Sequence, residues 1–209
     1  ANSAIWLIVG AFLFSRGFIK TGLGKRIAYN LIAAFGSSSL RLSYALALTD
    51  LFLAPATPSN TARVGGVIMP ITTSLAKAFG SEPHDGPRKI GSFLMQSIYQ
   101  VNTITSAMFQ TSMAGNTLVA ALALQSFSIG ITWGDWAMAA IVPGIIALII
   151  MPYFIYKVYP PEIKDSREAQ QMIKEELKGL GKMSFQEWVM LGVFILALVL
   201  WATSQFTKL

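Results

Sequence analysis

The residues LAPATPSNTAR, numbers 53–63, interrupt an apolar stretch that covers residues 40–79. The proline at position 58 has no backbone N–H to donate, and the serine, asparagine and threonine that follow it are favoured at the start of a helix. The sequence therefore predicts a hairpin of two helices, about 40–57 and 61–78, joined by a polar tip. Free N–H groups at such a helix start attract anions, although an ordinary loop that caps a helix has the same composition.

The overall composition is typical of a protein that crosses a membrane several times. Of the 209 residues, 54% are apolar and 12% are charged, whereas soluble domains are about 25% charged. This excludes a disordered chain, a nucleic-acid-binding domain and most soluble enzymes. The chain has no cysteine and one histidine, which excludes disulfides, thiolate metal sites and sites built from several histidines.

Four segments outside the hairpin have the length of a membrane span, about 20 residues. They are residues 4–20, 89–110, 137–156 and 185–203. Residues 22–35 are predicted to form an amphipathic helix in the membrane interface, with Lys25, Arg26 and Asn30 off its apolar line. Residues 132–136 are expected to form a short interfacial turn, and residues 162–182 a surface helix.

The chain is therefore expected to divide into six parts. These are 1–39 (first span and interfacial helix), 40–79 (helical hairpin), 80–128 (loop and interrupted span), 129–160 (span), 161–184 (cytoplasmic helix) and 185–209 (last span). The chain begins without methionine and stops just after an apolar run, so we expect it to be a fragment of a larger protein.

Positive charge is concentrated in three segments. Residues 20–41, 77–89 and 157–182 hold four, three and six of the 16 Lys and Arg residues, while residues 128–136 hold none. Lys and Arg mark cytoplasmic loops, so these three segments are predicted to be cytoplasmic. Orientation then explains the net charge of +6 without a nucleic-acid partner. Both ends of the hairpin lie on the cytoplasmic side, and its tip either stops within the membrane or reaches the outer surface.

A second break is predicted at residues 111–117, TSMAGNT. Gly115 permits an unusual backbone conformation, and Asn116 and Thr117 are suited to cap the helix that follows. Interrupted helices inside a membrane occur where they are buried in protein or line a cavity. Two such breaks are typical of the binding site of a secondary transporter. A flexible kink or an outer loop is the alternative.

Asp50 and Arg63 are the charged residues in the interior of the hairpin, away from Arg41 and Lys77 at its open end. A charge inside a membrane segment indicates function, so Arg63 either attracts a substrate carboxylate or has a structural role. Asp50 is expected to hold a neighbouring helix. At a rise of 1.5 Å per residue the two differ in depth by about 9 Å, so we expect them to have separate partners.

Residues 53–63, followed by Gly65-Gly66 and Met69-Pro70-Ile71, resemble the divalent anion/sodium symporter family. That family carries a Ser-Asn-Thr motif at the tip of a re-entrant hairpin. The form here is most similar to its citrate/succinate antiporters and plastid 2-oxoglutarate/malate translocators. Residues 111–118 resemble the family's unwound loop, with Thr117 in place of a common proline.

The resemblance implies roles for individual residues. The residues expected to bind substrate are Ser59, Asn60, Thr61, Arg63, Asn116 and Thr117. Oxygen atoms of Ser59, Asn60 and the Gly115 region would hold sodium in sodium-coupled members, whereas the antiporter-like members need no sodium. Family members are homodimers with an elevator-type displacement. They contain two inverted repeats, and this chain matches one.

The sequence thus predicts an all-α integral membrane fold: one inverted repeat of a secondary transporter, with a re-entrant hairpin and an interrupted helix. The expected function is non-enzymatic transport of di- or tricarboxylates, most readily by exchange, in a bacterial inner membrane or, less readily, a plastid inner envelope. One alternative is a related exporter of an inorganic oxyanion or a sodium/proton antiporter. Another is a membrane scaffold that transports nothing.

Overall fold

The computed structural model describes residues 9, 13 and 16–207, and every regular element in this part of the chain is helical. The prediction of an all-α chain is confirmed for these residues. Most of the predicted span 4–20 lies outside the described residues, of which 16–21 are helical. Gly22 follows with a φ of 77°, a left-handed conformation that favours glycine and separates this segment from the next helix.

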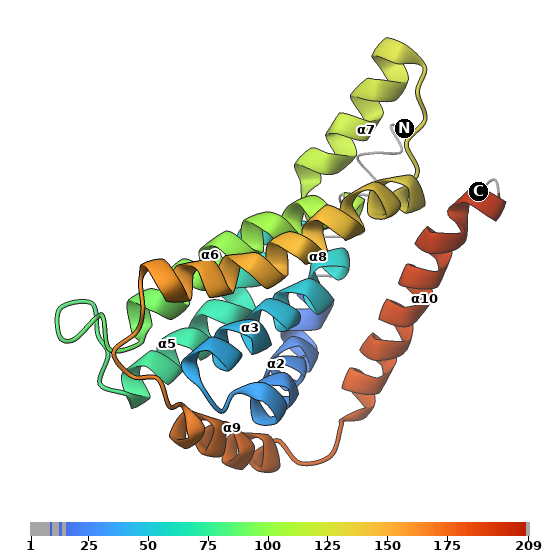
Figure 1. Cartoon of the computed structure of the whole chain (residues 1–209). Helices are drawn as coiled ribbons and strands as arrows, with labels where there is room; N and C mark the ends of the chain where they lie inside the picture. Colours follow the sequence, from blue (N-terminus) through green and yellow to red (C-terminus); the bar gives the residue numbers. More distant parts are fainter. Residues whose placement is uncertain (1–8, 10–12, 14–15, 208–209) are drawn as a thin grey trace.

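The α-helices follow one another along the chain (Figure 1). They are α2 (Leu23–Phe35), α3 (Ser39–Leu53), α4 (Asn60–Arg63), α5 (Met69–Ala78), α6 (Gly91–Met108), α7 (Ala114–Phe127), α8 (Trp133–Val158), α9 (Arg167–Gly179) and α10 (Phe185–Thr207). Short turns of other helix types are η1 (Ala54–Ala56) and η3 (Gln110–Ser112), both 3-10, and the π-helical η2 (Val64–Ile68).

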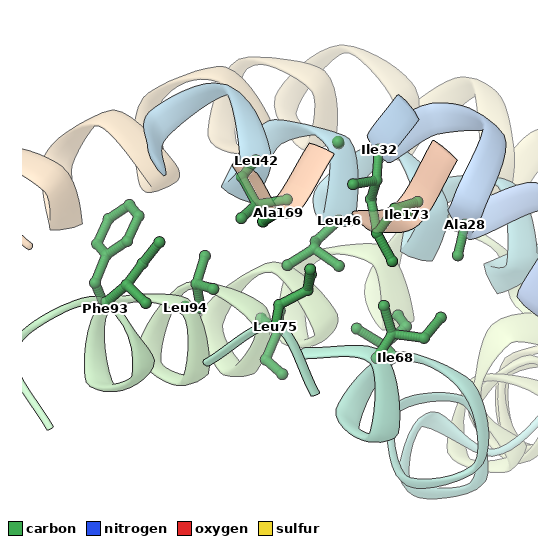
Figure 2. Close-up of a cluster of buried hydrophobic side chains, with 14 of the residues drawn as sticks. Ala28, Ile32, Leu42, Leu46, Ile68, Leu75, Phe93, Leu94, Ala169 and Ile173 are labelled. Atoms are coloured by element: carbon green, nitrogen blue, oxygen red, sulfur yellow. The ribbon is translucent and has the colours of Figure 1, made fainter. Parts of the chain in front are cut away.

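The main core is formed where α2, α3, the hairpin, α6 and α9 meet (Figure 2). Leu42 and Leu46 of α3 lie among side chains from the other helices, including Leu75 of α5 and Ile173 of α9. Removal of this apolar surface from solvent stabilises the bundle by roughly 25 cal/mol per Å². α9 lies across the ends of α2 and α3 and covers this end of the core (Figure 1).

The three basic segments are joined at one end of the molecule. In the connection between α8 and α9, Glu162 and Ile163 donate backbone hydrogen bonds to the carbonyls of Arg88 and Lys89. Farther along the same connection, the Lys164 carbonyl accepts a hydrogen bond from the Ser39 N–H, 3.0 Å away. The three basic segments, which were predicted to lie on the same side, are thus joined to one another by main-chain hydrogen bonds.

Two helices among the described residues are long and apolar enough to cross a membrane, Trp133–Val158 and Phe185–Thr203. α6 lies within the segment predicted as a span at 89–110, but it is not one of these two helices, because it carries many polar residues. It packs closely against α3 and α8.

One local prediction was wrong. Residues 132–136 do not form a separate turn, because Thr132 caps α8 and exchanges hydrogen bonds with Asp135, so that α8 begins at Trp133. This is a capping box, with aspartate in the third position of the helix. Arg26 lies off the apolar line of α2 and is nevertheless only 9% exposed, because its Nε donates to Glu187 Oε1 at 2.6 Å.

Candidate functional site

The hairpin tip consists of residues that leave the α-helical conformation between α3 and α4. Thr57 and Ser59 are extended, with φ of −128° and −130°. The Ser59 hydroxyl accepts a hydrogen bond from the Ala62 N–H at 3.2 Å, which is the capping role predicted for this stretch. Asn60 Oδ1 accepts from the Thr61 N–H at 2.9 Å. Ser59 and Asn60 are half-buried and Thr61 is exposed, so this tip presents polar side chains at the surface.

The second break separates α6 from α7. Phe109 and Met113 are extended on either side of η3. The carboxamide of Asn116 donates to the carbonyls of Ser106 and Phe109, at 2.7 and 2.9 Å. Asn116 therefore shares with Ser112 the task of satisfying carbonyls at the end of α6 that lack the usual helical partner.

Two details of this break differ from the prediction. Gly115 lies in the first turn of α7 with no positive φ, and the extended residues are Phe109 and Met113 instead. Asn116 and Thr117 lie inside α7 and do not cap it, because α7 begins at Ala114. The Thr117 hydroxyl donates to the Ala114 carbonyl at 2.8 Å.

The structure brings the two breaks into contact. The Thr111 hydroxyl donates to the Pro55 carbonyl at 2.7 Å. From the other side, the Trp133 indole N–H donates to the same hydroxyl oxygen at 3.0 Å. Trp136 donates to the Ala107 carbonyl at 2.9 Å. The break is thus held between the hairpin on one side and the start of α8 on the other.

Asp50 and Arg63 form a buried ion pair at 2.7 Å, so the prediction of separate partners was wrong. The depth count assumed that both helices continue to the tip, whereas residues 54–59 leave the α-helix and do not add depth in proportion to their number. The Arg63 guanidinium is also bonded to the carbonyls of Thr57 and Ser112. Arg63 is 1% exposed, so it is placed inside the protein and not on the tip surface.

A polar face of α6 completes this network and was missed in the sequence. Asn102, Thr105 and Ser106 all bond to Asp50 or Arg63. Their spacing of three and four residues places them on one helix face. That spacing was the available signal, whereas other polar residues of the same helix, such as Gln96 and Thr103, are exposed.

Among the described residues, the space found beside the tip is much smaller than a substrate. The cavity beside Thr57, Ala62 and Arg63 has a volume of about 10 Å³, which holds at most one water molecule. A larger groove of about 490 Å³ lies elsewhere, between α6 and α8, and is lined by Gln96, Gln100 and apolar residues. The polar groups of the tip therefore form an open surface here.

Metal ligation by acidic residues or histidine has no support in the described part of the chain, where no group of three or more such side chains is suited to hold an ion. The predicted sodium site uses neutral oxygens instead. Two of these, Ser59 Oγ and Asn60 Oδ1, already accept hydrogen bonds from backbone N–H groups.

Comparison with known proteins gives matches along the whole chain. The family described as the sodium:sulfate symporter transmembrane region matches residues 1–209. A putative malate transporter of Bacillus subtilis (strain 168) is 55% identical over 96% of the chain and 42% of its own length. A chloroplastic dicarboxylate transporter 1 of Spinacia oleracea is 49% identical over 94% of the chain and 35% of its own length. An L-tartrate/succinate antiporter of Escherichia coli (strain UTI89 / UPEC) is 40% identical over 96% of the chain and 42% of its own length. The chain thus spans about two fifths of the length of these relatives.

Proposed function

Because this chain belongs to the sodium:sulfate symporter family, we propose that the full-length protein is a secondary transporter that moves dicarboxylates across a membrane. The relatives are named as malate and dicarboxylate transporters and as a tartrate/succinate antiporter. The observation that carries the proposal is the contact between the hairpin tip and the break after α6, made by Thr111 and Pro55. Paired breaks of this kind gather backbone and side-chain donors at one place.

Ser59, Asn60 and Thr61 contact a substrate carboxylate in this proposal. Their side chains carry hydroxyl and amide donors at a half-buried or exposed position. Neutral donors at the start of the helical run from Asn60 to Ala78 suit an anion, because the N-terminal end of a helix carries partial positive charge. Asn116 and Thr117 contribute from the second break, chiefly by supporting its backbone.

Exchange of one dicarboxylate for another is the mode of transport that we propose, following the antiporter among the relatives. A sodium-coupled mode differs by carrying sodium as a second substrate on oxygens of Ser59, Asn60 and the Gly115 region. The same full-length protein is proposed to be a homodimer that works by elevator-type displacement, as the family resemblance implies.

The orientation of the chain follows from its basic segments. Residues 20–41, 77–89 and 157–182 lie on the cytoplasmic side in this proposal. It is supported by the backbone hydrogen bonds that join the α8–α9 connection to Arg88 and Lys89 and to Ser39. The protein then lies in a bacterial inner membrane with the base of the hairpin facing the cytoplasm.

The test is transport by the full-length protein in proteoliposomes. Vesicles are loaded with unlabelled succinate or left empty, and labelled succinate, citrate or 2-oxoglutarate is added outside, with and without a sodium gradient. We expect uptake that requires internal dicarboxylate and ignores sodium. The Asn60→Ala variant is expected to lose uptake at normal expression, while Ser74→Ala, at an exposed position of α5, keeps it.

Other outcomes have defined meanings. Sodium-driven uptake into empty vesicles replaces exchange with symport and supports the sodium site. Absence of uptake for every carboxylate contradicts the substrate class and favours transport of an inorganic ion. Unchanged uptake by Asn60→Ala contradicts the placement of the site at the tip.

A further inference from the structure

The Arg63 guanidinium is bonded at all three of its nitrogens to groups from four parts of the chain. Its Nε donates to Asp50 Oδ1 on α3 at 2.7 Å. Its Nη1 donates to the Thr57 carbonyl in the hairpin tip and to the Ser112 carbonyl in the second break, both at 3.1 Å. Its Nη2 donates to the hydroxyls of Thr105 and Ser106 on α6, at 3.2 and 3.0 Å.

These five contacts match the donor capacity of the side chain. A guanidinium has five N–H groups and no acceptor, so in this arrangement Arg63 has no N–H left for a substrate carboxylate. The side chain is 1% exposed. Its charge is balanced by Asp50, also 1% exposed, whose oxygens accept from Asn102 and Thr105 as well.

The two carbonyls bonded to Nη1 explain why arginine stands here. Thr57 and Ser112 both lie at interruptions of helices, where carbonyls lack the usual helical partner. A single nitrogen therefore connects the hairpin tip to the break after α6. A lysine ammonium is a compact point charge on a flexible stem, and it cannot reproduce the planar fork that reaches Asp50, both carbonyls and two hydroxyls together.

From this geometry we propose that Asp50 and Arg63 are positioning residues that fix the hairpin tip against the second break without touching substrate. The inference rests on the proposed function, because it assumes that the tip and the break together form the transport site. The pair keeps the site in its binding-competent arrangement. When that arrangement is populated less, the apparent affinity falls in proportion, while the rate at saturating substrate changes little.

The test compares variants of the full-length protein in succinate exchange. Arg63→Lys keeps the charge beside Asp50 and loses the fork. We expect normal expression, a KM raised about tenfold through the loss of one to two hydrogen bonds that hold the site, and a maximal rate within about twofold of the parent. Arg41→Lys is the matched control, because Arg41 is an exposed arginine at the other end of α3. It is expected to leave KM unchanged.

A paired variant separates positioning from folding. Arg63→Gln alone leaves the Asp50 carboxylate buried without its counter-charge, and such a variant is expected to express poorly. Asp50→Asn with Arg63→Gln removes both charges and restores expression, but not the bonds to the two carbonyls, so KM stays raised. If the double variant regains both normal expression and normal KM, the pair serves folding alone and the proposal is overturned. An unchanged KM for Arg63→Lys overturns it as well.

Hydrogen–deuterium exchange gives a readout that does not depend on transport. In Arg63→Lys, backbone exchange is expected to rise in peptides 55–63 and 109–116 together, and not in α9. If both peptides show this rise but the full-length protein exchanges no dicarboxylate, the positioning role of Asp50 and Arg63 is supported and the proposed function is rejected. A rise in one peptide only, or in neither, rejects the positioning pair even if transport is intact.

Discussion

Replacement of Asn116 by alanine tests whether this residue supports the second break or binds substrate. The change removes two hydrogen bonds, of 2.7 and 2.9 Å, from the carboxamide to the carbonyls of Ser106 and Phe109. Each bond contributes about 1 kcal/mol net. The Ser112 hydroxyl can donate to the Ser106 carbonyl at 2.6 Å, and the Ser112 backbone N–H donates to the Phe109 carbonyl at 3.1 Å, so neither is left without a partner. We therefore expect a loss of about 2 kcal/mol, without the further penalty of a buried unsatisfied carbonyl.

The assay is thermal unfolding of the full-length protein in detergent, with and without succinate. The melting temperature of Asn116→Ala is expected to fall by about 2–4 °C, because a long chain loses few degrees per kcal/mol. Succinate at about one hundred times its Kd should still stabilise the variant by about 2.7 kcal/mol. Thr103→Ala is the control, since Thr103 is exposed and its hydroxyl bonds only to the carbonyl of Tyr99 in the same helix. Its melting temperature should stay within a degree of the parent.

The opposite pattern would refute this reasoning. If Asn116→Ala melts like the parent but gains no stability from saturating succinate, Asn116 binds substrate directly. In that case its two carbonyl bonds are incidental. Both amide hydrogens of Asn116 are occupied in the structure, so a direct role would require the break to rearrange when substrate binds.

Further predictions concern the packing around the site. Glu187→Ala leaves the Arg26 guanidinium buried without its carboxylate, so we expect the free energy of unfolding to fall by about 3 kcal/mol, measured by thermal unfolding. Adding Arg26→Ala should recover part of this loss. A double variant that is no more stable than Glu187→Ala contradicts the expectation. In Gly144→Ala the new Cβ would lie 2.5 Å from Cγ of Met108, which costs about 1–3 kcal/mol and outweighs the gain in helix propensity. Gly192→Ala, where nothing lies within 4 Å of the new Cβ, should instead stabilise α10 by about 0.5–1 kcal/mol, and melting shifts of the same sign for the two glycine variants would be evidence against the close contact of α6 with α8.

The parts of the fold that local chemistry decides were predictable from the sequence. A helix start after Pro58 follows from the sequence alone, because Ser59 caps the N–H groups next to it in the chain. The helical surface segment near residues 162–182 also follows from its apolar periodicity, and Ile173 of α9 is buried as such a pattern requires.

The contacts of the site depend on residues far apart in the chain, and the sequence alone did not predict them. Arg26 meets Glu187 across 161 positions, and no local pattern connects two residues at that distance. Asp50 and Arg63 were assigned different depths because a uniform helical rise was assumed, whereas η1 and the extended residues after it change the path of the backbone. Which polar residues of α6 join the network depends on where α3 packs, because Asn102 and Thr105 bond to Asp50 of that helix.

The connection between α8 and α9 has a consequence for the order in which the chain assembles. Its Ile163 carbonyl accepts from the Ser39 hydroxyl, 124 positions earlier in the chain. At a synthesis rate of roughly 5–20 residues per second, about 6–25 seconds pass between the emergence of the two residues from the ribosome. During that interval the start of α3 lacks this partner, so the whole hairpin is synthesised before this hydrogen bond can form. The time taken to translate residues 40–163 therefore sets how long the newly made hairpin lacks this contact at its base.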